Sequence, residues 1–215
     1  MAEPPNKGLG VRGWELGREE LLRLCGNKSL RLESDDVPSS RLAVKPSSSY
    51  IKGESMEFRK LIEETRNSKE YKDFMDSNPE AYLVHVFFMT NSSPQIGFYS
   101  KKSKKVSTFE INTLNTSIVF HEEQPFQETE HDIKELELSK ITIDFNKALE
   151  IANNIKDEFY KKEMVNRQVV ILQHLNIGQI FNITFITQTF KTLNIKINAE
   201  TEEVISHELA NLIGL

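Results

Sequence analysis

A helical pattern followed by several short apolar runs occurs twice in the chain, and this repeated order limits the folds that the sequence can adopt. In residues 56–76, apolar side chains recur mostly at the spacing of one helix face, and Asn78-Pro79 would end that helix. The run over 81–90, AYLVHVFFMT, is rich in aromatic and β-branched residues, as is typical of a strand with a buried face. Further strands are expected over 95–100, 105–111 and 117–120.

The same order returns in residues 141–215. Asp144 or Thr142 is a suitable N-cap for a helix over 144–163. The apolar stripe of that helix comprises Phe145, Ala148, Leu149, Ala152, Ile155 and Phe159. Strands are expected over 167–175, 179–188 and 190–199, with Phe181, Ile183 and Phe185 on one face. The last run, over 203–209, is expected to complete the strands or to end in a short helix.

The two blocks can be aligned by their last hairpins. At a shift of 98 residues, Tyr99 falls on Ile197, Ser100 on Asn198 and Val106 on Val204. A period near 90 residues is too long for a solenoid and indicates duplication of one small module. Neither half would bury much surface alone, so the halves are expected to pack together. The predicted fold class is α+β, with two tandem helix-plus-antiparallel-sheet units packed together.

The second block carries a family resemblance. The segment ITIDFNKALEIANNI, followed by FNITFITQTFKTLNIKINAETEEVIS, resembles the PepSY domain. Asn198 stands where that family often has Asp, and Glu202 stands where it often has Gly. The first block is similar to a more divergent copy. The matching residues are Ile195, Ile197, Asn198, Ala199, Thr201 and Val204.

The resemblance implies a helix packed on an antiparallel sheet, in a binding or inhibitory module rather than an enzyme. PepSY domains occur in propeptides that inhibit and chaperone thermolysin-type proteases, and in spore-cortex regulators. The partner that this implies is a protein of unknown identity, with peptidases as one class, and a homodimer is the other assembly to consider.

Charge is spread unevenly along the chain, whose net charge is −5. Residues 121–215 hold most of the excess acid, and residues 121–140 are predicted to be an acidic connector. A solvated linker is favoured for 122–137 over a metal site or a site for a basic partner. The basic cluster Lys101, Lys102, Lys104 and Lys105 lies in a predicted turn, which favours a solvated hairpin tip over a phosphate site. No nucleic-acid partner is therefore expected.

Residues 1–55 differ from the rest of the chain. They hold four of the seven prolines and no lasting period, although WELGREELLRLCG could form a short helix. The folded unit is expected to begin near Met56, and the poorly ordered leader is interpreted as an extension, a docking segment or a mis-assigned start. The single cysteine, Cys25, excludes an intramolecular disulfide, and no secretory signal pattern is evident, so a cytoplasmic location is expected. The apolar run over 82–89 is too short to span a membrane.

Candidate chemistry is sparse. The GLGVRG motif at residues 8–13 lacks the preceding strand that a dinucleotide site needs. His85 and His174 occupy comparable places on the first strand after each helix, and a pseudo-twofold axis could bring them together. Core or half-exposed histidines are favoured over ligands at both positions. No catalytic residue, cofactor or bound metal is predicted, and His85 and His174 are the candidate binding residues.

The function predicted from the sequence is a non-enzymatic protein-interaction or regulatory module, which binds through a sheet face or edge. The alternative is a small-molecule- or metal-binding domain, or an enzyme, that uses a cleft between the two repeats. A deep polar cleft lined by His85 and His174 would favour the alternative. An open edge or a flat apolar face would favour the interaction module.

Overall fold

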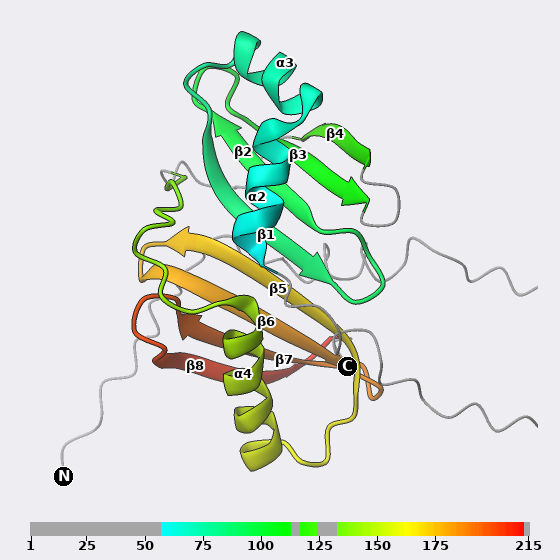
Figure 1. The fold of residues 1–215 in the computed structure, drawn as a ribbon. Helices are drawn as coiled ribbons and strands as arrows, with labels where there is room; N and C mark the ends of the chain where they lie inside the picture. Colours follow the sequence, from blue (N-terminus) through cyan, green and yellow to red (C-terminus); the bar gives the residue numbers. More distant parts are fainter. Residues whose placement is uncertain (1–56, 113–116, 124–132, 213–215) are drawn as a thin grey trace, which may run out of the picture.

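The computed structural model describes residues 57–112, 117–123 and 133–212, and in these ranges the chain forms one antiparallel sheet of eight strands with three helices (Figure 1). The strand order is β4-β3-β2-β1-β5-β6-β7-β8. The helices are α2 (Phe58–Asn67), α3 (Lys69–Ser77) and α4 (Phe145–Phe159). The strands are β1 (Tyr82–Met89), β2 (Gln95–Ser100), β3 (Lys105–Asn112), β4 (Ser117–Glu123), β5 (Val165–Leu175), β6 (Gly178–Thr187), β7 (Lys191–Asn198) and β8 (Val204–Asn211). The predicted α+β class with an antiparallel sheet is confirmed, although sheet predominates.

The helices pack against one face of the sheet, which we call the helix face. α2 contacts β3 and α3 contacts β4, whereas α4 contacts β6 and β7. One continuous apolar core lies beneath all of them, and it joins residues of α2, α3 and α4 to alternate residues of the strands. Phe181, Ile183 and Phe185 all belong to this core, so the predicted alternation of β6 is confirmed.

Direct pairing of β1 with β5 joins the two halves of the sheet. The pairs run from His85 opposite Gln173 to Met89 opposite Val169. The ring of Phe88 on β1 also lies 4.5 Å from that of Phe145 on α4, measured between centroids. The strands therefore form one shared sheet rather than the separate sheets that two packed units would each supply.

The first helical segment is interrupted at Ser68, so the single helix predicted over 56–76 is wrong. The Ser68 hydroxyl accepts a hydrogen bond from the Tyr71 N–H at 3.1 Å and donates to the Thr65 carbonyl at 2.7 Å. Serine favours such caps over helix interiors because its side chain competes for backbone groups. The break at Ser68 lets α2 and α3 take different directions over the sheet (Figure 1).

The α4 helix is shorter than predicted. Asp144 caps it, since its carboxylate accepts a hydrogen bond from the Lys147 N–H at 2.7 Å. The helix ends at Phe159, whose side chain is 56% exposed. Phe159 therefore does not belong to the buried stripe, although the helical spacing predicted that it would.

The predicted strands are all present, and the last run forms β8 rather than a short helix. The shift of 98 residues, however, superimposes the β2–β3 hairpin on the β7–β8 hairpin. β2 and β3 are the second and third strands after α3, whereas β7 and β8 are the third and fourth strands after α4. The predicted hairpin alignment is therefore inconsistent with the order of the strands.

The end of the acidic connector is built into the fold. Leu136 is buried in the main core, as are Ile141 and Ile143 just after the connector's polar part. The Leu136 N–H donates to the Leu83 carbonyl of β1 at 2.9 Å. Glu135 and Glu137 are exposed, as a solvated linker predicts, whereas the burial of Leu136 was not predicted. Residues 124–132 and the predicted leader over 1–55 lie outside the described residues. In the described ranges, no helix is long and apolar enough to cross a membrane.

Candidate functional site

β1 separates from β5 at one end of their pairing, and the connector segment 133–138 enters between them. A bulge between Leu83 and His85 shifts the register of β1 against β2, and direct pairing with β5 begins only at His85. Before that point the Leu83 carbonyl bonds the connector instead, through Leu136. Bulges redirect side chains and are frequent beside functional sites. This place, which we call the fork, is the first candidate site.

The imidazole of His85 covers Gly97, its cross-strand neighbour on β2. A Cβ atom at position 97 would lie 2.1 Å from His85 Cε1 and 2.5 Å from each ring nitrogen. The absence of a side chain at Gly97 is therefore what allows the ring to lie against β2. Burial lowers the pKa of His85 to about 4, so the ring is neutral at pH 7.

Replacing Gly97 with alanine is expected to destabilise the fold by about 1–3 kcal/mol, because the new methyl group overlaps the His85 ring. Alanine in a strand is normally the more stable residue, so a loss here points to the contact rather than to the backbone. Urea unfolding of the wild type, Gly97→Ala, His85→Ala and the double variant would measure the loss of stability in each background. Most of the loss should vanish in the His85→Ala background, and an equal loss in both backgrounds would contradict the contact.

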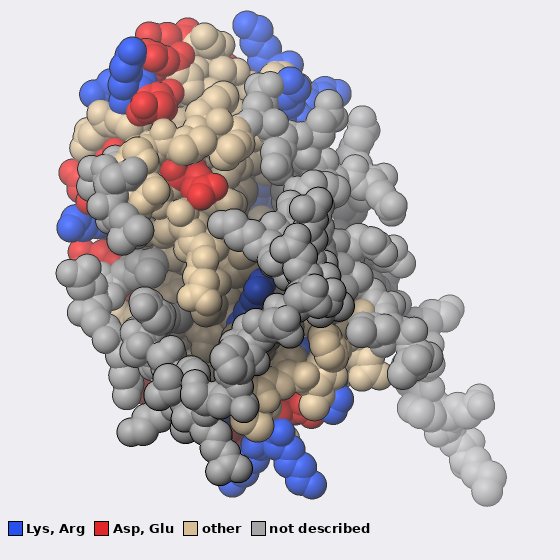
Figure 2. Space-filling model, turned by 90° about the vertical axis from the view of Figure 1, so that its right-hand side faces the viewer, with Lys and Arg blue, Asp and Glu red and all other residues tan. Residues whose placement is uncertain are grey.

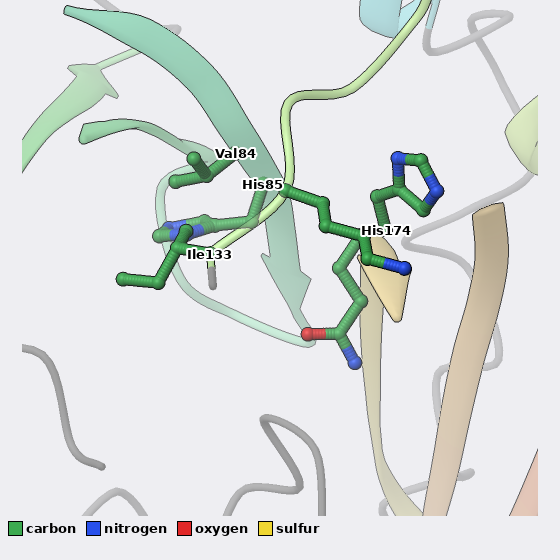
Figure 3. A pocket seen from close by; sticks show the side chains of 6 residues that line it. Val84, His85, Ile133 and His174 are labelled. Carbon is green, nitrogen blue, oxygen red and sulfur yellow. The ribbon is translucent and has the colours of Figure 1, made fainter. Parts of the chain in front are cut away.

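His174 lies near the end of β5 and is bound to the connector. Its Nδ1 donates to the Glu135 carbonyl at 2.7 Å, since a carbonyl can only accept. Figure 3 shows the His85 and His174 rings pointing away from one another, on opposite sides of the connector. The two candidate histidines therefore lie close in the fold without facing each other.

One small pocket at the fork is lined by both histidines (Figure 3). Its volume of about 10 Å³ has room for about one water molecule, far less than a site for an organic ligand requires. The other lining residues are Val84, Ile133, Lys134 and Gln173. Within the described part of the chain, no three His, Cys, Asp or Glu side chains are placed to hold a metal ion.

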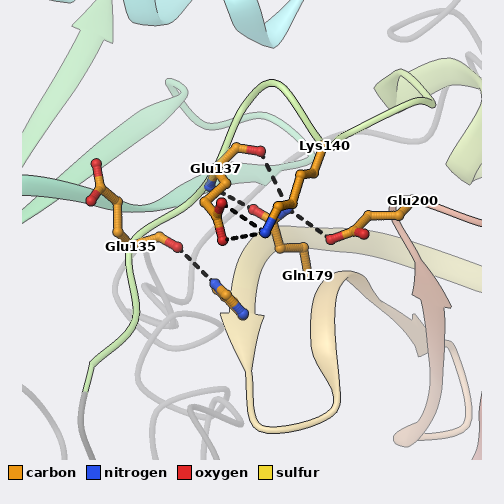
Figure 4. Close-up of polar contacts among 6 residues, drawn as sticks. Glu135, Glu137, Lys140, Gln179 and Glu200 are labelled. Carbon is orange, nitrogen blue, oxygen red and sulfur yellow. Dashed lines mark hydrogen bonds and ion pairs between the residues drawn. The ribbon is translucent and has the colours of Figure 1, made fainter.

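A polar network beside the fork ties the connector to β6 (Figure 4). The side-chain amide of Gln179 accepts from the Glu137 N–H at 2.7 Å, and donates to the Glu137 carbonyl at 3.3 Å and to Glu200 Oε1 at 3.0 Å. The Lys140 ammonium lies 2.8 Å from the Glu137 carboxylate. The hydrogen bond between them lowers the pKa of Glu137 and raises that of Lys140. These polar groups are hydrogen-bonded to one another, so we interpret the network as a structural one that holds the connector against β6.

The second candidate site is the outer edge of β8, the last strand of the sheet. β8 pairs with β7, and most of its side chains are exposed. Since the Leu212 N–H donates to the Phe190 carbonyl, alternation along the pair turns the N–H groups of His207 and Leu209 outward. An outward row of backbone groups is a template on which another strand can pair.

An aromatic cluster borders this edge. The ring of Phe159, at the end of α4, stacks on that of His207 of β8, with centroids 5.1 Å apart and planes 24° from parallel. The Tyr160 hydroxyl lies 2.8 Å from His207 Nδ1. Sequence reasoning missed this cluster because it placed Phe159 in the buried stripe. The available signal was the adjacent aromatic pair, Phe159 and Tyr160, at the end of the helical pattern.

The remaining sequence candidates do not converge on a site. Lys101, Lys102 and Lys104 lie in the exposed β2–β3 turn, as predicted, whereas Lys105 begins β3 and is partly buried. On the side of the molecule seen in Figure 2, lysine and arginine side chains are scattered among acidic ones rather than gathered into one basic patch. The GLGVRG motif and Cys25 lie outside the described residues.

Comparison with known proteins gives a distant structural likeness. No model of a known protein family matches the chain, and no curated protein matches it. A crystal structure of a candidate lipoprotein from Clostridium difficile 630 shares 14% sequence identity, with a TM-score of 0.47. The match covers 72% of this chain and 93% of that one. The function must therefore be argued from the geometry of this chain itself.

Proposed function

We propose that this protein is a non-enzymatic protein-interaction or regulatory module, which binds a partner through the outer edge of β8. The observation that carries the proposal is the exposed final strand with its outward N–H groups. A partner segment in extended conformation would add a further strand there through main-chain hydrogen bonds. The exposed Phe159 beside the edge would supply an apolar contact.

The resemblance of residues 141–215 to the PepSY domain supports a binding or inhibitory role, and a peptidase is the partner class that it favours. We further propose that the chain holds two tandem units, of which the second is the clearer. The support is that a helical segment followed by four strands occurs twice in the element order. A second copy of the chain is the other partner that could add to β8, giving a homodimer.

The alternative is a small-molecule or metal site between the halves, with His85 and His174 as its binding residues. The small volume of their shared pocket favours the interaction module instead. Thermal unfolding with added zinc separates the two. A rise in melting temperature that His85→Ala and His174→Ala both abolish would favour the metal site.

A proline at position 207 is expected to weaken partner binding at β8 by at least tenfold, because it removes an outward N–H from the middle of the edge. His207→Ala is the matched control, since it loses the same side-chain contacts but keeps the N–H. Partners captured by the wild-type chain would be compared quantitatively with those captured by each variant, and the molar mass of each protein would report self-association. Equal retention by His207→Pro and His207→Ala would rule out strand addition at this edge.

A further inference from the structure

The face of the sheet opposite the helices, which we call the second face, carries an apolar cluster of its own. It lies over β1, β5 and β6, on the residues that alternate with those of the main core. Its members are Phe87, Val169, Ile171, Ile186 and Leu212, with Met89 packed against them. The described helices lie on the helix face, so none of them covers this cluster.

The burial pattern of the strands marks where the second face is covered. β6 is buried continuously from Gln179 to Thr187, whereas β7 alternates between buried and partly exposed residues. Continuous burial is typical of a strand with both faces covered, and alternation of a strand with one face solvated. Val169 and Ile186 are only 1% and 5% exposed. Burial of the second face is therefore greatest over β1, β5 and β6 and ends before β7.

The polar side chains beside the cluster are already bonded to one another. Asn194 Nδ2 donates to Asn182 Oδ1 at 2.6 Å and to Thr184 Oγ1 at 2.9 Å. Asn182 and Thr184 are themselves buried. An apolar segment can therefore lie over this part of the face without leaving these groups unpaired.

The lengths of the stretches outside the described ranges, and the elements that they join, indicate which of them can reach the second face. A single chain already buries the cluster, so a second copy is not required. Outside the described ranges, the internal stretches 113–116 and 124–132 and the end 213–215 are short, whereas 1–56 is long and leads directly into α2. Fifty-six residues can reach well over 100 Å when extended, enough to pass around the sheet.

We infer that the N-terminal segment of this chain docks on the second face through residues 14–25, WELGREELLRLC. These residues bring together Trp14, Leu21, Leu22 and Leu24. Because the segment is tethered, its effective concentration at the face is in the millimolar range, and a modest affinity is enough to keep it bound. The docking is independent of the β8 edge, which lies beyond the part of the second face that is covered.

The chain's single tryptophan, Trp14, provides a direct test in the full-length protein. Docking predicts blue-shifted Trp14 emission and weak quenching by acrylamide. Leu21→Asp is expected to increase quenching several-fold while the sheet stays folded. Leu30→Asp, the same change outside residues 14–25, should leave Trp14 protected. Met89→Lys changes the proposed docking surface itself, on the rim of the cluster, and should likewise increase the quenching of Trp14.

Two results would overturn the inference. Trp14 in the wild-type chain could be quenched as readily as free tryptophan, which would show that the segment is not docked. The full-length protein could instead be a dimer in which Trp14 stays quenchable and Met89→Lys yields monomers, which would assign the face to a second copy. Circular dichroism would confirm for each variant that the sheet remains folded.

Discussion

Phe145→Ala is expected to lower the free energy of unfolding by about 3–5 kcal/mol, within a single cooperative transition. Phe145 is 2% exposed at the start of α4, and its ring lies 4.5 Å from that of Phe88 on β1. The change would open a cavity at the point where the helix of one half meets a strand of the other. Because one core and one sheet run through both halves, the loss of stability should affect both halves together.

Phe159→Ala provides the matched control on the same helix. Phe159 is 56% exposed, so its loss should change stability by no more than about 0.5 kcal/mol. Urea unfolding followed by circular dichroism measures both variants. Two separate transitions in Phe145→Ala would show that the halves unfold independently, contrary to the continuous sheet.

Acidification is expected to destabilise the protein through His85. The imidazole has a pKa of about 4 in the folded chain and about 6.5 when unfolded. Between these values the unfolded chain binds more protons, so the stabilisation is fully present above pH 6.5 and is lost as the pH falls toward 4. The loss attributable to this residue is up to about 3 kcal/mol.

The measurement compares the wild-type chain with His85→Gln at pH 7 and pH 4.5. Hydrogen bonds from Lys140 and Lys191 lower the pKa values of Glu137 and Glu163, and the contributions of these carboxylates are common to both proteins and cancel in the difference. The wild type should lose more stability than His85→Gln over the same interval. Equal losses would mean that the His85 ring is not kept neutral by burial.

Most individual elements could be predicted from local patterns, because each depends on residues close in sequence. β2 occupies the predicted range 95–100, between a proline and a lysine-rich turn. The break at Ser68 was missed, because helical spacing continues on both sides of it. The pairing of β1 with β5 could not be predicted either, because alternation indicates which residues share a face but not which strands are neighbours.

The site could be predicted only in part. The sequence placed His85 and His174 on corresponding first strands, and the structure sets both beside one pocket. The contact of His85 with Gly97 depends on a bulge that changes the cross-strand partner, and no local pattern records it. For the β8 edge, the sequence indicated only a short apolar run that completes a hairpin. Its exposure follows only from the order of all eight strands.

The pairing of β1 with β5 has a consequence for how the protein is made. β1 emerges from the ribosome about eighty residues before the strand that completes it, since Met89 pairs with Val169. Until then β1 can pair only with β2, and its other edge stays unpaired, with Phe87 and Phe88 near the end of the strand. Contacts so distant in sequence form slowly, and unpaired strands aggregate. Yield in the cell should therefore depend on the rate of translation and on chaperones that shield β1 until β5 arrives.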